Sequence, residues 1–199
     1  MKKYLLFSIV TAFSFAAQAA DLSYNYVGVG YSEGKLEKKV DYDGADINAS
    51  FAINESFFVL ASYQALETDE SGSSIEVDQG EFGVGYHSPL SDTVDLVATL
   101  AYQNVDIEVA GPGFGGSSDF DGYGIGFGLR WLVCNNFELN AGVEYRDVEE
   151  AIDSEVGYEV GARYLMEDFS IGVGYSAIDI IEDEDLSMEA VRIDFRFDF

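Results

Sequence analysis

Thiol and imidazole side chains are almost absent from this chain. Cys134 is the only cysteine and His87 the only histidine in 199 residues. A single cysteine excludes an intramolecular disulfide and leaves one free thiol. No combination of cysteine and histidine therefore suggests a metal centre, and we expect no metal and no cofactor.

Long apolar runs are also lacking, apart from the first residues. No other segment approaches 18 uninterrupted apolar residues, which excludes a helical membrane protein. The first twenty residues have Lys2 and Lys3, an apolar stretch over residues 4–15 and the small-residue motif Ala17-Gln18-Ala19. This pattern is typical of a secretory signal peptide, and its apolar part is too short for a spanning anchor. We predict cleavage after Ala19 or Ala20, giving a signal peptide over residues 1–20 and one domain over residues 21–199.

Positively charged residues are scarce as well. Lysine and arginine number 10 against 37 aspartates and glutamates, for a net charge of −27, and removal of Lys2 and Lys3 takes it to −29. Such a chain repels nucleic acid and bare anionic surfaces, so nucleic acid is excluded as a partner. Divalent cations could bridge it to lipopolysaccharide phosphates. The acidic run around Asp179 and residues 182–185 lacks the glycine and the spacing of a calcium-binding loop, and we expect it to be solvated.

The sequence does contain strict alternation. In the stretch GYGIGFGLRW, residues 122–131, the odd-numbered positions carry large apolar residues and the even-numbered positions carry glycines and Arg130. We call each such set of alternate positions in a strand a parity. Successive side chains leave a strand on opposite faces, so a period of two predicts a β-strand with two different faces. A soluble barrel turns its apolar face inward, whereas a membrane barrel turns it outward to lipid.

The C-terminal nonapeptide VRIDFRFDF favours a membrane barrel over a soluble one. Its apolar parity ends on the last residue of the chain and consists of Val191, Ile193, Phe195, Phe197 and Phe199. This end resembles the insertion signal of bacterial outer-membrane β-barrels, in which a final phenylalanine follows apolar residues at every second position. The resemblance implies that outer-membrane lipid surrounds the protein and that the barrel-assembly machinery is its partner during insertion.

Turn signals predict the number of strands. Short polar connections are expected at Asn54–Ser56, Ser88–Asp92, Cys134–Asn136 and Met166–Asp168, and longer acidic or glycine-rich loops at Ser32–Gly44, Glu67–Ser74, Glu108–Phe120, Asp147–Glu155 and Asp179–Ser187. Alternating short turns and long loops are typical of outer-membrane barrels. We predict an all-β fold: a transmembrane antiparallel up-and-down β-barrel of ten strands, or of eight if one hairpin lies outside the wall.

Aromatic residues gather at the ends of the predicted strands. Beside the short turns stand Phe51, Phe57, Trp131, Phe137, Tyr164, Phe169, Phe197 and Phe199, and beside the long loops stand Tyr31, Tyr63, Tyr102, Tyr123, Tyr145, Tyr158 and Tyr175. Two belts of amphipathic rings are what the two membrane interfaces favour. Tyr26 and Phe58 break the parity, which indicates a bulge or an apolar end of the lumen.

All five arginines fall on the parity opposite the large apolar residues, and acids share that parity. An arginine that faced lipid would cost about 2 to 4 kcal/mol near the midplane, so the lumen is their expected place. We predict a lumen network of ion pairs among Arg130, Arg146, Arg163, Arg192, Arg196, Glu81, Asp95, Glu138, Glu144, Glu159, Asp194 and Asp198. The remaining cations of the mature chain, Lys35, Lys38 and Lys39, lie in the first long loop.

This lumen set leaves three functions open. The first is a plugged barrel with a structural or surface role, the second a narrow channel for small solutes or ions, and the third a hydrolase at the rim. A hydrolase needs a histidine near the outer rim with an acid or serine partner, whereas His87 is expected at the short-turn end beside Ser88. We therefore expect no enzyme.

The N-terminal third carries a family resemblance. Two segments carry it: DLSYNYVGVGY over residues 21–31 and DGADINASFAINESFFVLASY over residues 43–63. They resemble the small outer-membrane barrels whose founding member was described as an activator of rice immune-receptor signalling in xanthomonads. That family is grouped with OmpX-like and OmpA-like porin-type barrels. The resemblance implies the outer membrane of a Gram-negative bacterium and no established chemistry, and we expect a monomer.

Overall fold

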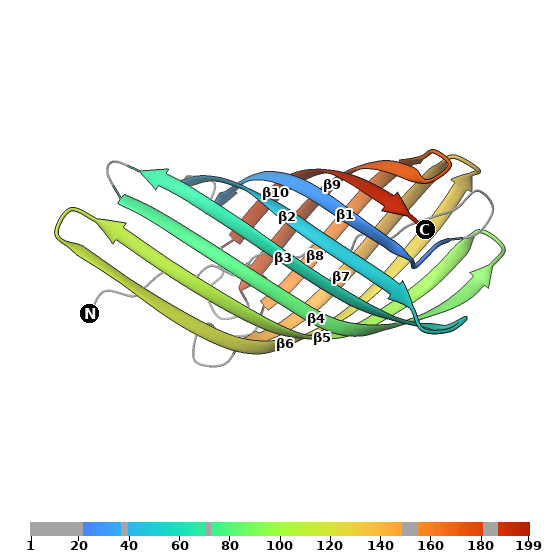
Figure 1. Cartoon of the computed structure of the whole chain (residues 1–199), viewed down its shortest axis with the longest axis horizontal. Helices are drawn as coiled ribbons and strands as arrows, with labels where there is room; N and C mark the ends of the chain where they lie inside the picture. The colour runs from blue at the N-terminus through green and yellow to red at the C-terminus, as the bar shows by residue number, and fades with distance from the viewer. Residues whose placement is uncertain (1–21, 37–39, 71–72, 149–154, 181–186) are drawn as a thin grey trace.

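The computed structural model describes residues 22–36, 40–70, 73–148, 155–180 and 187–199 (Figure 1). Ten antiparallel strands form one closed barrel, in which each strand pairs with its neighbours in the chain and β1 pairs with β10. The ten-strand prediction is confirmed, and the alternative of eight strands is wrong. No helix of the described residues is long and apolar enough to cross a membrane.

The strands differ greatly in length. They are β1 Tyr26–Leu36, β2 Val40–Ala52, β3 Phe57–Glu70, β4 Ser73–Ser91, β5 Val94–Gly111, β6 Phe114–Cys134, β7 Phe137–Val148, β8 Glu155–Leu165, β9 Phe169–Ile180 and β10 Ser187–Asp198. Strands β4, β5 and β6 are the longest, and in Figure 1 the β3–β4 and β5–β6 hairpins extend far at one end of the barrel. We call this the hairpin end. The opposite end, with the turns that precede β3, β5, β7 and β9, is the short-turn end.

The outer wall is apolar because the large apolar residues stand at alternate positions of each strand and these positions face outward. All fifteen aromatic residues of the two predicted belts are exposed on this surface, from Phe137 at 37% to Tyr123 at 60%. Tyr102 and Tyr123 are register partners and contact each other edge to face, and Phe57 packs against Tyr86. Between the belts the exposed residues are mainly aliphatic, as the hydrocarbon of a membrane requires.

The predicted long loops are wrong in extent. Strand pairing continues through most of them: in the segment Glu108–Phe120 only Pro112 and Gly113 lie outside strands. Gly113 has a φ of 83°, a left-handed conformation that suits glycine after proline in a two-residue turn. Loops were predicted where the sequence lacks outward-facing apolar side chains. Backbone hydrogen bonds between strands form without such side chains, so the strands continue into these segments. Of the last two predicted loops, residues 149–154 and 181–186 lie outside the described residues.

The short turns are also tighter than predicted in two places. Strand β4 continues to Ser91 and β6 to Cys134, so the turns after them consist of residues 92–93 and 135–136. Register shifts at Pro89/Ser91 and Leu132/Cys134 accommodate the extra residues as bulges. By contrast, the register is continuous through the two parity breaks of the sequence. Tyr26 and Phe58 are buried in the lumen: Phe58 belongs to a small apolar cluster with Tyr24 and Val97 at the short-turn end, as one of the two predicted alternatives has it, whereas Tyr26 lies under Arg196.

Candidate functional site in the barrel lumen

The structure buries all twelve residues of the predicted lumen network. Each is less than 9% exposed, and Arg130 is fully buried. They come from strands β4 to β8 and β10, on the parity opposite the outward aromatics: Glu81, Asp95, Arg130, Glu138, Glu144, Arg146, Glu159, Arg163, Arg192, Asp194, Arg196 and Asp198. Charged groups removed from water require partners within the protein, so their mutual geometry decides what the lumen can do.

The Arg130 guanidinium on β6 makes a two-pronged ion pair with Glu138 on β7. Its Nε donates to Glu138 Oε1 at 2.8 Å and its Nη2 to Oε2 at 3.0 Å. A third donor, Nη1, reaches the backbone carbonyl of Ser23 at 3.2 Å. The fork geometry matches a carboxylate in both distance and plane, which makes this a strong charge-assisted pair.

A second pair lies within β7 itself. Arg146 donates to Glu144 Oε2 from Nε at 2.9 Å and from Nη2 at 2.6 Å. The other oxygen of Glu144 accepts a hydrogen bond from Gln103 Nε2 on β5 at 3.1 Å. Strand β6 lies between β5 and β7, and a Cβ on its Gly124 would come within 2.6 Å of Glu144 Oε1 and 2.7 Å of Gln103 Nε2. Glycine at this position therefore leaves room for the contact between β5 and β7, which passes over β6.

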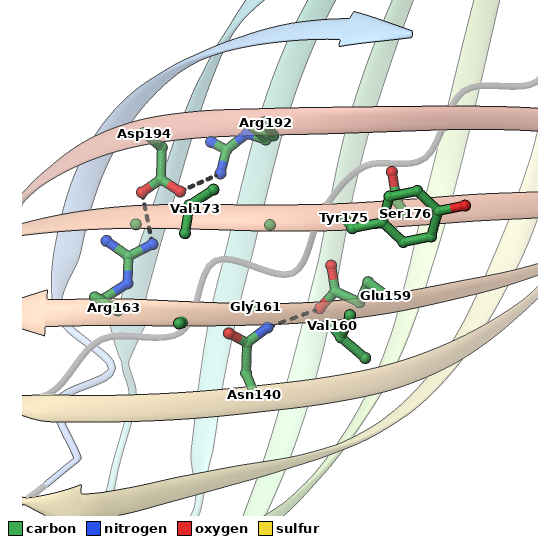
Figure 2. Close-up of a pocket in the computed structure, with 13 residues that line it drawn as sticks. Asn140, Glu159, Val160, Gly161, Arg163, Val173, Tyr175, Ser176, Arg192 and Asp194 are labelled. Atoms are coloured by element: carbon green, nitrogen blue, oxygen red, sulfur yellow. Dashed lines mark hydrogen bonds and ion pairs between the residues drawn. The ribbon is translucent and has the colours of Figure 1, made fainter. Parts of the chain in front are cut away.

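The third group joins β8, β10 and β2, and Figure 2 shows its centre. Asp194 accepts hydrogen bonds from Arg163 Nη2 at 2.5 Å and from Arg192 Nη1 at 2.6 Å. Arg192 also forks onto Asp46, with distances of 2.8 and 2.7 Å. Two cations and two anions thus alternate across the β1–β10 junction that closes the barrel.

The remaining arginine, Arg196 on β10, lies over the ring of Tyr26 at 4.1 Å from its centroid and 3.5 Å from Asp198 Oδ1. Eight buried carboxylates accompany the five buried arginines, counting Glu155 in addition to the predicted acids. Beside Arg163 and Asp194 a cavity of about 30 Å³ remains, which is enough for a water molecule or two but not for a solute.

The segment Leu22–Asn25 crosses the lumen at the short-turn end. The ring of Tyr24 stacks on Phe58 at 4.8 Å and on His87 at 3.9 Å, and the Arg130 Cζ lies 4.7 Å from its centroid. The Tyr24 hydroxyl donates to Asp95 Oδ2 at 2.9 Å. Burial raises the pKa of the Tyr24 phenol, so this hydroxyl is a neutral donor. Only 4% of Tyr24 is exposed.

Three hydrogen bonds, each with at least one backbone partner, tie the same segment to β2 and to the C-terminus. Ser50 Oγ donates to the carbonyl of Tyr24 at 2.8 Å, and the amide of Ala52 donates to Asn25 Oδ1 at 2.9 Å. Phe199, the last residue, donates its amide to the carbonyl of Asn25 at 3.2 Å. We call Leu22–Asn25 the mouth segment, since it lies at the short-turn end of the lumen.

His87 is placed at the short-turn end, as the sequence predicted. Its Nδ1 lies 3.2 Å from Asp95 Oδ2, and the ring is covered by Tyr24. Its acid partner is Asp95, and both residues contact Tyr24 of the same segment. Among the residues that the structure describes, no group of three or more His, Cys, Asp or Glu side chains is arranged to hold a metal ion.

The hairpin end has an apolar interior instead of a polar one. Eight buried residues from β1 to β5, β9 and β10 pack together inside it: Leu36, Tyr42, Leu66, Val77, Val105, Ile107, Ile178 and Met188. We call this set the apolar cap. The lumen therefore has three layers: the mouth segment with its aromatic contacts, the charged belt and the apolar cap.

Sequence reasoning missed several members of these layers. Asp46 alternates with Ile47 on β2, so its parity could have assigned it to the lumen beside Asn48 and Ser50. Glu155 was placed in a loop and is in fact the first residue of β8. Tyr24 precedes the first strand, where no alternation exists to read, and its position depends wholly on tertiary contacts.

Comparison with known proteins gives two results. A family model described as an outer membrane protein beta-barrel domain matches residues 5–176. No curated protein sequence is significantly similar to the chain.

Three solved barrels are similar in fold. The translocator domain of the autotransporter NalP from Neisseria meningitidis has a TM-score of 0.54 at 10% identity, with 89% of each chain covered. Neisserial surface protein A has a TM-score of 0.50 at 14% identity, covering 89% of this chain and 98% of its own. The porin NanC has a TM-score of 0.52 at 8% identity, covering 86% of this chain and 100% of its own. At these identities the similarity concerns the fold alone.

Proposed function

Because the chain belongs to the outer membrane protein beta-barrel family, we propose that it is a non-enzymatic barrel with a closed lumen that presents acidic hairpins at the surface of a Gram-negative cell. The observation that carries the proposal is the three-layered filling of the lumen. Buried side chains pack inside the lumen towards both ends, and between them the five arginines pair with carboxylates, which supports a closed lumen rather than an open path. Interiors of small barrels are commonly filled in this way.

The hairpin end is the part that such a protein offers to its surroundings. Residues 114–119 of β6 are all exposed, and the outward face of the neighbouring strands carries Glu76, Asp106 and Glu108. These acids lie just beyond the tyrosine belt, at the depth expected for lipopolysaccharide headgroups. We propose outer-membrane lipid and lipopolysaccharide as the constant neighbours of the protein, the latter through bridging divalent cations, and a monomeric state.

The remaining expectations from the sequence become parts of the same proposal. Export uses a signal peptide over residues 1–20 that is removed, and the barrel-assembly machinery receives the C-terminal signal from Val191 to Phe199. Within the outer-membrane family, we propose a place in the branch that resembles the xanthomonad activator of rice immunity. The resemblance over residues 21–31 and 43–63 supports that placement.

Cysteine labelling on intact cells tests the orientation and the surface role. The native Cys134 is exposed at the short-turn end, so a membrane-impermeant maleimide should label it only after the outer membrane is permeabilised. In a Cys134→Ser background, Ser117→Cys on the β5–β6 hairpin should be labelled without permeabilisation. Labelling of Cys134 on intact cells, with Ser117→Cys protected, would contradict the proposal.

A further inference from the structure

The cations of the lumen come from one side of the barrel. The five arginines lie on β6, β7, β8 and β10, and none lies on β1 to β5. On the opposite side, four buried neutral residues of β3, β4 and β5 face the lumen: Gln64, Gln79, Gln103 and Thr99. We call this set the neutral stripe. Its charged neighbour is Glu81, which pairs in register with Gln103.

The neutral stripe runs from the apolar cap towards the mouth segment. Gln64 and Gln79 are register partners, and each lies two residues from a member of the cap, Leu66 or Val77. At the other end, Thr99 lies two residues from Val97, which belongs to the small apolar cluster with Tyr24 and Phe58. The stripe therefore spans the depth that the ion pairs occupy on the other side of the lumen.

Several polar atoms of the stripe have no hydrogen-bond partner in the part of the chain that the structure describes. They are Gln64 Oε1, Thr99 Oγ1, Gln103 Oε1 and both Oε1 and Nε2 of Gln79. These atoms present practically no surface that water could contact, and Gln79 as a whole is only 2% exposed. A buried amide or hydroxyl with neither a protein partner nor water costs free energy. The closed lumen therefore carries a penalty along the stripe, whereas each arginine of the belt has a carboxylate partner.

We propose that the lumen opens along the neutral stripe, because water that enters there supplies the hydrogen bonds that these side chains lack in the closed barrel. Only side chains move apart, and the pairing of the strands is kept. The ion pairs and the apolar cap favour the closed state, and hydration of the stripe favours the open one, so the open state is a minor population. This inference rests on the proposed closed lumen and adds the place where it opens.

The stripe also determines what enters first. Amide groups both donate and accept hydrogen bonds, and they carry no charge. The opening along β3 to β5 therefore admits water and small uncharged molecules that form hydrogen bonds, while the charged groups of the belt stay paired with one another.

The reaction of a buried cysteine with iodoacetamide, a small uncharged thiol reagent, measures this opening. In a Cys134→Ser background, Thr99→Cys places a thiol in the stripe. Ser170→Cys places a similarly buried thiol in the belt, where Arg163 Nη1 donates to Ser170 Oγ at 3.1 Å. With the folded barrel in detergent micelles, we expect Thr99→Cys to react about fivefold faster than Ser170→Cys or more, the ratio that corresponds to one hydrogen bond of about 1 kcal/mol.

A second substitution links the reaction to the unpaired amide. Methionine has nearly the shape of glutamine and no amide, so Gln79→Met removes a group whose hydration favours opening. Added to Thr99→Cys, it should slow the reaction with iodoacetamide about fivefold.

Urea unfolding shows independently whether Gln79 is unpaired in the closed barrel. Gln79→Met alone should lower the equilibrium constant of unfolding about fivefold or more, because the variant no longer buries an amide without a partner. The matched control is Gln103→Met, which loses the hydrogen bond from Nε2 to Glu144 Oε1 and should raise that constant. A higher constant for Gln79→Met would show that this amide has a partner and would overturn the inference.

Equal rates for Thr99→Cys and Ser170→Cys, or a faster Ser170→Cys, would also overturn it, and so would a rate that Gln79→Met leaves unchanged. If Thr99→Cys does not fold, the unfolding comparison decides. A steady current through the wild type would contradict the closed lumen itself. Equal slow rates in a barrel that passes no current would refute only the place of opening, so the two failures are distinguishable.

Discussion

A buried arginine is stable in the lumen only while its carboxylate remains beside it. Arg130 and Glu138 are each at most 1% exposed, so neither can recover its hydration if the other is removed. In such pairs the cost of leaving one charge without its partner exceeds the net stabilisation by the pair itself.

Removing one partner of this pair is therefore expected to destabilise the barrel strongly. Glu138→Ala should lower the free energy of unfolding by about 3–5 kcal/mol, whereas Arg130→Leu combined with Glu138→Leu should change it far less. Urea unfolding in detergent, followed by the fluorescence of Trp131, the only tryptophan, measures both. A double variant as unstable as the single one would show that the pair stabilises by itself.

Glycines on the lumen face provide a second test at the residue scale. A Cβ on Gly172 would lie 2.7 Å from both Arg163 Nη2 and Asp194 Oδ1, whereas a Cβ on Gly174, on the same face of β9, would meet only the carbonyl of Val160 at 3.6 Å. Gly172→Ala should cost about 1–3 kcal/mol through overpacking. Gly174→Ala is the matched control and should cost much less. Equal costs in the same unfolding assay would mean that glycine serves sheet curvature rather than ion-pair space.

At the scale of elements, the hairpins place like charges side by side. Glu76 on β4 pairs in register with Glu67 on β3 and with Glu108 on β5, and Glu67 in turn pairs with Asp43 on β2. Directly opposed like charges destabilise a sheet. Backbone pairing holds these strands together, with the inward-facing Val77 and Ile107 packed in the apolar cap.

Neutralising the central acid should stabilise the hairpins. Glu76→Gln is expected to raise the midpoint of thermal unfolding by about 1–3 °C in low salt, with the difference disappearing near 1 M salt where the Debye length falls to about 3 Å. Parallel melts of the two proteins at the two salt concentrations measure this. A lower midpoint for the variant would show that the carboxylate makes a stabilising contact.

The sequence predicted the membrane wall because lipid and lumen impose different residues on the two parities of each strand. It underestimated the length of the hairpins, because outward-facing aspartates and glutamates indicate that a strand has left the membrane and not that the strand ends. The apolar cap was missed for a related reason: Leu36 and Tyr42 lie in the segment Ser32–Gly44, which was predicted to be a loop, whereas Val77 and Ile107 lie on the lumen face of predicted strands that extend farther than expected. The side chains that face the lumen therefore change from charged to apolar along a single strand. The alternation identifies the lumen face but not the depth at which this change occurs.

At the scale of the whole molecule, three layers of different chemistry succeed one another along the lumen. The mouth segment relies on aromatic stacking and hydrogen bonds, the belt on ion pairs, and the cap on apolar packing. Tyr24 and Arg130 join the first two layers, because the guanidinium contacts both the tyrosine ring and the carbonyl of Ser23. Loss of Arg130 should therefore weaken the belt and the mouth together.

Current through the refolded mature barrel in a planar lipid bilayer tests the closed lumen most directly. The wild type should pass no steady current, and Arg130→Ala combined with Arg163→Ala should show intermittent openings because the belt loses two cations and the mouth segment one of its supports. Lys35→Ala, which removes an exposed cation at the hairpin end, serves as the control and should stay silent. A steady current through the wild type would contradict the account and make the lumen charges the lining of a channel.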